Sequence, residues 1–367
     1  TLNEIINEYQ GQPYCTDYHA LLDKKEDDRV KARKNWQTIE GIKDLKEGYL
    51  SQVIHRITSL MVEYQAIVVL EDLNFGFMRG RQKVEKQVYQ KFEKMLIDKL
   101  NYLVDKKKPL DETGGILHAL QLTSKFESFQ KLGKQSGFLF YIPASLTSKI
   151  DPVTGFANYI SCKYENADKA WNLFGKFDDI RYNSKNDYFE FVITKYTDFN
   201  SKAAGRQEWT ICSYGNRIKT SRNEKNNEWD SQTVSPTQEL KELFKKYGID
   251  YTQNLKAQIL LKKDDAKFLK ELLYCLSLIL QMRNSIPGTE TDYIISPVAD
   301  ENGHFYNSEE GREGLPDNAD ANGAYNIARK GLWAVRQIME AEDPTKVKLA
   351  MTNAEWMEFA QEKPYLK

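Results

Sequence analysis

Hydrophobic residues in the first 150 positions follow two different spacings. From about residue 17 to residue 64 they recur largely every three or four positions, which predicts a helical region. Residues 66–70 and 138–142 form short continuous apolar runs, typical of strands that are covered on both faces. Between them, the apolar side of residues 84–103 predicts a second long helix. The first part of the chain is therefore expected to pack long helices beside a buried sheet.

The pattern changes beyond Pro143. Residues 147–155 are rich in turn-forming residues, and short strand-like runs then mix with polar loops. Residues from about 145 to 315 therefore look like an insertion between two core elements. The elements expected beyond Pro143 are strands at 188–193 and 208–212 and helices at 263–282, 320–340 and 353–362.

Composition limits the class of protein. The 367 residues are 41% hydrophobic, which allows a sizeable core, and their number makes two domains the default expectation. The 52 Lys and Arg residues almost balance the 53 Asp and Glu residues, so the formal net charge is −1. A dedicated nucleic-acid module is usually basic overall, so any nucleic-acid surface on this chain has to be a local patch.

Cysteine usage and apolar segments argue against other classes. The four cysteines are scattered without a C-x-x-C pair, which argues against a zinc ribbon or a disulfide scaffold and favours reduced thiols. No signal peptide opens the chain, and the longest apolar stretch, residues 272–280, is too short to span a bilayer. We therefore expect a cytoplasmic protein without a membrane partner. The cysteines are Cys15, Cys162, Cys212 and Cys275.

Two acids far apart in the sequence occupy positions that suit metal binding. Glu71 follows the strand expected at 66–70, and Asp320 stands at the start of a helix, whose dipole favours an ionised carboxylate. Rigidly held carboxylates can bind Mg²⁺, and two such cations can stabilise both the attacking and the leaving oxygen of phosphodiester cleavage. Taken alone, each acid has an ordinary alternative: Glu71 can start a loop, and Asp320 can cap its helix.

Basic residues form two local groups, one before Trp36 and one in a turn after Glu71. The group before Trp36 is either a solvated helix face with acidic counter-charges or a basic helix lying against a phosphate backbone, with the indole as a wedge. The residues of interest are Arg29, Arg33 and Lys34 in the first group and Arg79 and Arg81 in the second.

The sequences around both acids resemble a known family. Residues 69–77, Val-Leu-Glu-Asp-Leu-Asn-Phe-Gly-Phe, and residues 319–325, Ala-Asp-Ala-Asn-Gly-Ala-Tyr, resemble the second and third RuvC motifs of type V CRISPR-associated RNA-guided DNA endonucleases. The resemblance covers essentially all 367 residues. Further blocks are similar to the V-A (Cpf) subtype, at residues 48–55, 88–100, 147–152 and 280–285.

The resemblance implies an α/β fold: a ribonuclease-H-like RuvC core, incomplete at its N-terminal strands and interrupted by a mixed α+β Nuc insertion. The family's first RuvC Asp is expected upstream of Thr1, and Asn318 stands where relatives often have Asp. The implied segments are the end of the first RuvC segment at 1–16, a bridge-helix region at 17–40, the second RuvC segment at 41–144, the Nuc domain at 145–315 and the third RuvC segment at 316–367.

The same resemblance implies roles for single residues. Glu71 and Asp320 match two of the three metal-binding carboxylates of a two-metal site for Mg²⁺, with Mn²⁺ as a substitute. Arg283 matches the arginine needed to cut the target strand; read from the sequence alone, it could be a helix C-terminal cation. Tyr214 and Arg217 either hold single-stranded DNA or pack at a strand end. The nucleic-acid contacts expected in all are Arg29, Arg33, Lys34, Trp36, Arg79, Arg81, Tyr214, Arg217, Ser285 and Asp292.

The implied activity is metal-dependent hydrolysis of target DNA, on both strands and on single strands in trans, by a monomeric bacterial antiviral effector. Its partners would be a guide crRNA, the target DNA and the N-terminal part of the effector, without which the chain is expected to be inactive. One alternative is a catalytically inert nucleic-acid-binding module, made of the bridge helix and a Nuc groove. An unrelated RuvC-like resolvase or transposase would need dimerisation and symmetric junction binding, and the sequence suggests neither.

Overall fold

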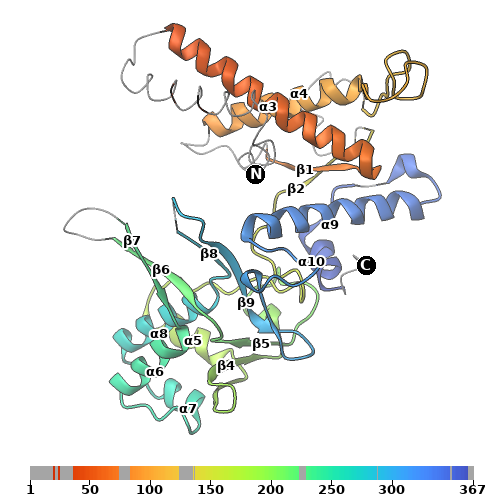
Figure 1. Ribbon diagram of the computed structural model, residues 1–367. Coiled ribbons are helices and arrows are strands. Elements are labelled where there is room, and N and C mark those ends of the chain that lie inside the picture. The colour runs from red at the N-terminus through yellow and green to blue at the C-terminus, as the bar shows by residue number, and fades with distance from the viewer. Residues whose placement is uncertain are drawn as a thin grey trace. The chain divides into compact units, whose positions relative to one another are not determined.

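The chain divides into two units, Thr1–Ala144 and Ser145–Lys367, drawn as ribbons in Figure 1. The structure is a computed structural model and describes residues 20, 24, 36–73, 83–123, 135, 137–222, 229–286, 288–347 and 349–362. The boundary between the units falls beside Pro143, where the sequence pattern changes. Each unit has helices, at least one sheet and a hydrophobic core of its own. The fold is α/β, as expected, with short sheets and many helices.

In the first unit, two long helices pack against a two-stranded parallel sheet. β1 (Val68–Asp72) pairs in parallel with β2 (Leu139–Pro143), so that Glu71 lies opposite Ile142. α3 (Trp36–Tyr64) and α4 (Lys83–Asn101) supply most of the remaining core of this unit. The buried residues of this cluster are Ile54, Met61, Leu96, Ile97, Leu100, Leu139 and Tyr141.

Alternate residues of the two strands face these helices. Leu70 and Tyr141 belong to the same hydrophobic cluster as residues of α3 and α4. Because successive side chains of a strand point to opposite faces, the Glu71 side chain points away from the helices and the Asp72 side chain points toward them. β1 begins and ends two residues later than expected, since its ladder with β2 continues through Glu71 and Asp72. Glu71 is therefore inside the strand and does not start a loop.

The second unit contains three short antiparallel sheets within its described residues. Their strand orders are β3-β4-β5, β6-β7 and β10-β9-β8. The strands are β3 (Asp179–Asn183), β4 (Tyr188–Ile193), β5 (Trp209–Cys212), β6 (Arg217–Arg222), β7 (Trp229–Val234), β8 (Arg283–Ser285), β9 (Asp292–Ala299) and β10 (Phe305–Asn307).

Helices of the second unit build its core together with these sheets. α8 is apolar on most of its surface and buries eight of its residues, which explains the longest apolar stretch of the chain. Aromatic side chains such as Phe189 and Phe244 fill the same core, with ring centroids 5.3 Å apart. The helices are α5 (Ala167–Gly175), α6 (Pro236–Lys246), α7 (Leu255–Leu260), α8 (Ala266–Ile279), α9 (Ala319–Glu340) and α10 (Asn353–Gln361).

Most long elements lie where the sequence predicts them. The strand at 188–193 has the expected bounds, and the helices expected at 320–340 and 353–362 each differ by one residue at one end. The helix expected at 263–282 is three residues shorter at each end, because Asp265 caps its start and Leu280 caps its end. The divisions expected at 316 and within the first 40 residues stay predictions.

Two further observations concern cysteines and helix length. Cys162, Cys212 and Cys275 are free thiols, and Cys15 lies outside the described residues. None of the helices in the described ranges combines the length and the hydrophobicity that crossing a membrane requires.

Candidate active site

Arg283 bridges two carboxylates in the second unit. Its Nε and Nη2 atoms donate to Oδ1 and Oδ2 of Asp292, each at 3.0 Å. Nη2 also donates to Oδ1 of Asp320 at 2.8 Å. The two-point contact with Asp292 fixes the plane of the guanidinium. Partial burial disfavours the charged form of Arg283, but the hydrogen bonds to Asp320 and Asp292 outweigh this effect and raise its pKa above the ordinary value.

The β8–β9 hairpin brings Arg283 and Asp292 together. Antiparallel pairing sets Ser285 opposite Asp292 and Arg283 opposite Ile294. Arg283 and Asp292 are therefore diagonal neighbours on one face of the sheet, within reach of a long side chain. The sequence-based alternative of a helix C-terminal cation is wrong for Arg283, because α8 ends at Ile279 and Arg283 belongs to β8.

Asp320 reaches this pair from the start of α9, where it is the second residue. Asn318 is the N-cap of this helix, and its side chain accepts a hydrogen bond from the backbone N–H of Ala321 at 2.7 Å. The alternative of Asp320 as the cap is therefore wrong. The Asp320 side chain is 60% exposed, and its Oδ2 atom accepts no hydrogen bond from the described residues. The helix dipole stabilises negative charge at this position.

Two buried amides hold the start of α9 in place. Asn322 and Asn326 are both 0% exposed. Asn322 Nδ2 donates to the Ile150 carbonyl at 3.0 Å, and Asn326 Nδ2 donates to the Thr147 carbonyl at 3.1 Å. Buried polar groups that find partners in this way fix one packing arrangement. The Asn residues after Asp320 therefore anchor the first turns of α9 to the segment that opens this unit.

In the first unit, Tyr89 holds the strand that carries Glu71. The Tyr89 hydroxyl, on α4, donates to the Glu71 carbonyl oxygen at 2.7 Å. Burial raises the pKa of Tyr89 above its ordinary value, and Glu93 and other acids nearby raise it further. The tyrosine therefore remains a hydrogen-bond donor at neutral pH.

Glu93, on α4, lies near Asp72 at the end of β1. It is 1% exposed, and neither of its carboxylate oxygens accepts a hydrogen bond from the described residues. Burial raises its pKa to about 7, and the nearby Asp72 carboxylate adds to this effect. Sequence analysis missed Glu93, because its place in an amphipathic helix is indistinguishable from that of an exposed glutamate.

Other predicted contact residues lie in different environments. Arg217 is 0% exposed and donates to the carbonyls of Tyr214, Asn216 and Ile279 at 3.0 to 3.1 Å. Burial lowers its pKa to about 10. The predicted contact with nucleic acid is therefore wrong for Arg217, and the packing alternative describes it. Tyr214 is partly exposed and stacks on Phe305, with ring centroids 4.1 Å apart and an interplanar angle of 10°.

The remaining predicted contacts are described only in part. Ser285 is exposed at the end of β8. Trp36 begins α3, but its side chain lies outside the described part of the structure. The other predicted contacts outside the described residues are Arg29, Arg33, Lys34, Arg79 and Arg81.

The carboxylates differ in how well they suit a divalent cation. Asp320 fits, because it is exposed and one of its oxygens is unbonded, whereas both oxygens of Asp292 are held by Arg283. Within the described ranges, no group of three or more His, Cys, Asp or Glu side chains lies close enough together to hold an ion. Glu71 and Asp320 belong to different units, and their sharing of cations stays a prediction.

Comparison with known families identifies the family of this chain. A family model described as the RuvC nuclease domain matches residues 1–365, nearly the whole chain. Members are nucleases, and they generally use divalent metal ions such as Mg²⁺. The match covers both the strand with Glu71 and the helix with Asp320. The chain belongs to the RuvC nuclease domain family.

Proposed function

We propose that this chain is the nuclease portion of an RNA-guided type V-A CRISPR effector and cleaves target DNA by metal-dependent hydrolysis. The contact of Arg283 with Asp320 carries the proposal, because it sets a permanent cation beside an exposed acid at a helix start. The motifs at residues 69–77 and 319–325, which resemble those of the type V effectors, support the same function. The guide RNA, the target DNA and the N-terminal part of the effector are the proposed partners.

Charge balance supports metal dependence. Asp292, Asp320 and the Arg283 guanidinium together leave one net negative charge, which repels a phosphodiester. A divalent cation held by Asp320 would make the site positive. Bound there and at Glu71, such ions would stabilise the charge that develops on the attacking and leaving oxygens.

The residues of the chain would position the scissile phosphate. A guanidinium stays charged at any pH that the protein meets and can hold two phosphate oxygens at once. Asp292 fixes the orientation of Arg283 through two hydrogen bonds, so that Nη1 stays available for a substrate oxygen. Asp320, on the same arginine, lies beside the position that this phosphate would take.

Cleavage of a labelled single-stranded DNA in Mg²⁺ or Mn²⁺ tests this function. The chain is assayed alone and with the N-terminal part of the effector, guide and target supplied in trans. We expect cleavage on mixing, loss of cleavage in Asp320→Asn and in Glu71→Gln, and no loss in Asp264→Asn, which changes an exposed acid elsewhere in the second unit. DNA binding without any metal-dependent cleavage in the mixture would instead identify an inert binding module.

A further inference from the structure

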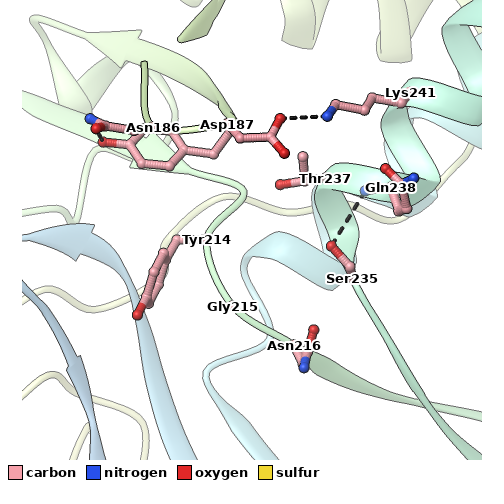
Figure 2. Close-up of a pocket in the computed structure, with 10 residues that line it drawn as sticks. Asn186, Asp187, Tyr214, Gly215, Asn216, Ser235, Thr237, Gln238 and Lys241 are labelled. Carbon is pink, nitrogen blue, oxygen red and sulfur yellow. Dashed lines mark hydrogen bonds and ion pairs between the residues drawn. The ribbon is translucent and has the colours of Figure 1, made fainter. Parts of the chain in front are cut away.

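A polar pocket of about 400 Å³ opens in the second unit, apart from the residues that Arg283 contacts. Three segments line it: the turn before β4, the loop between β5 and β6, and the first turn of α6. Figure 2 shows Tyr214, Asn216 and Gln238 around this space. Its volume suits a ligand of the size of one nucleoside, and its walls are more polar than apolar.

The charges in the pocket cancel. Lys241 forms an ion pair with Asp187, drawn as a dashed line in Figure 2. The Tyr182 hydroxyl also donates to Asp187 at 2.5 Å. Because the cation of the lining is already paired, the pocket offers no net positive charge to a phosphate. A neutral polar ligand fits it better.

An aromatic platform stands at one side of the pocket. Tyr214 lines the pocket and stacks on Phe305, whose ring also meets Tyr188 edge-on at 5.7 Å. Contacts with two neighbouring rings hold Phe305, so the platform is in place before any ligand binds. Nucleobases of single strands stack on such rings whatever their sequence, because every base has a π-face.

Two amide side chains of the lining are available for hydrogen bonds. Among the described residues, neither the Asn216 nor the Gln238 side chain has a hydrogen-bond partner. An amide carries both donors and an acceptor, the combination that base edges present. A flat heterocycle with donors and acceptors along its edge therefore matches this lining in both shape and chemistry.

The loop that carries Tyr214 and Asn216 is fixed to β9, the strand that begins with Asp292. Arg217 Nη1 holds the carbonyls of Tyr214 and Asn216, and the Tyr293 hydroxyl donates to the Asn216 carbonyl at 3.3 Å. Gly215 has φ +74°, a backbone conformation that residues with a side chain rarely adopt, and a Cβ there would lie 2.1 Å from Ile295 Cδ1, so a larger residue would strain this loop. Tyr293 and Ile295 belong to β9, which begins with Asp292.

We propose that the pocket receives one unpaired nucleobase of the strand to be cut, stacked on Tyr214 and hydrogen-bonded by Asn216 and Gln238; this inference rests on the proposed function. β9 connects the pocket loop to Asp292. A base bound in the pocket would therefore hold the nucleic-acid strand at a fixed position relative to Arg283. The pocket would thus add a base-binding subsite to the group formed by Arg283, Asp292 and Asp320, whose proposed contact is with the phosphate.

Binding is tested with the full chain in EDTA, so that no cleavage occurs. Fluorescence anisotropy compares a labelled single-stranded oligothymidylate with an oligomer of the same length and charge in which every nucleotide is abasic. We expect the abasic strand to bind about tenfold more weakly. The double variant Asn216→Ala/Gln238→Ala, which keeps the Tyr214 ring, should lose part of this difference, while Gln232→Ala, an exposed glutamine outside the pocket, should keep it.

Photocrosslinking gives a second measurement that is independent of affinity. An oligomer with 5-iodouracil should crosslink to the peptide that contains Tyr214, and the crosslink should be lost in Tyr214→Leu but kept in Tyr214→Phe. Equal affinities for the two oligomers, or an unchanged difference in the double variant, would overturn the inference. If the base-dependent affinity is present but Asp320→Asn changes no cleavage, the proposed function fails while the pocket assignment stands.

Discussion

Nη2 of Arg283 lies 2.8 Å from Oδ1 of Asp320, a residue 37 positions later in the chain. The same guanidinium holds both oxygens of Asp292. A lysine in its place would offer one point charge on a flexible stem and could not make both contacts. Arg283 is therefore expected to be irreplaceable even by another cation.

Arg283→Lys is expected to lower the rate of target-strand cleavage by about a hundredfold, comparable to the loss of one preorganised donor in other active sites. Single-turnover cleavage of a labelled target strand measures the effect. Arg181→Lys is the matched control, because Arg181 also contacts two acids, Asp179 and Glu190, elsewhere in the unit. Equal rates for Arg283→Lys and the unchanged protein would remove Arg283 from the site.

Asn318 is expected to tolerate Asp but not Ala. Either Asn or Asp can accept the hydrogen bond from Ala321 N–H that caps α9, whereas Ala cannot. Asn318→Ala should lower the free energy of unfolding by about 1 kcal/mol, and Asn318→Asp should leave it nearly unchanged. Urea titration followed by circular dichroism measures both. A loss of stability in both variants, or in neither, would contradict the capping role.

Tyr89→Phe should loosen the strand that carries Glu71. Loss of the hydrogen bond to the Glu71 carbonyl is expected to cost about 1 kcal/mol, while the ring and its packing remain. Hydrogen exchange should therefore become faster in β1, and DNA cleavage should need more Mg²⁺ to reach half its maximal rate. Tyr102→Phe, which changes a tyrosine that is 64% exposed, is the control and should alter neither measurement.

Glu93 should make stability depend on pH. Its pKa is about 7 in the folded chain, against an ordinary value of 4.5, so the folded state binds more protons than the unfolded state between these pH values. Stability is therefore expected to fall as pH rises from about 4.5 through about 7, by up to ~3 kcal/mol in total.

Glu93→Gln keeps the shape of the side chain and removes the titration. The variant should be the more stable protein above pH 7, and its stability should change less between pH 5 and 8. Thermal unfolding in EDTA at a series of pH values measures this, with the exposed Glu63→Gln as control. If the stability of Glu93→Gln follows the same pH profile as that of the unchanged protein, folding does not raise the pKa of Glu93.

Local patterns were enough to predict several elements, including the strand that contains Glu71 and the helix that begins beside Asp320. The apolar runs behind β1 and β2 and the periodicity of α4 depend only on neighbouring residues, so their bounds come out within about two positions. The start of α9 is equally local, because its N-cap, Asn318, lies only two residues before Asp320. The β8–β9 hairpin was not predicted, since three residues of β8 carry no periodicity and follow an apolar helix without a Gly or Pro to end it.

By itself, the sequence determined which side chains carry charge at a strand and at a helix start, and which family the motifs resemble. Only the tertiary structure decided the partner of each group: Asp292 and Asp320 for Arg283, backbone carbonyls for Arg217, and a buried place without a partner in the described residues for Glu93. The physical reason is that the partners are far apart in the sequence. The hydrogen bonds of Arg283 to Asp292 and Asp320 and of Arg217 to Ile279 join residues 9, 37 and 62 positions apart, and no local periodicity records which distant segments will meet.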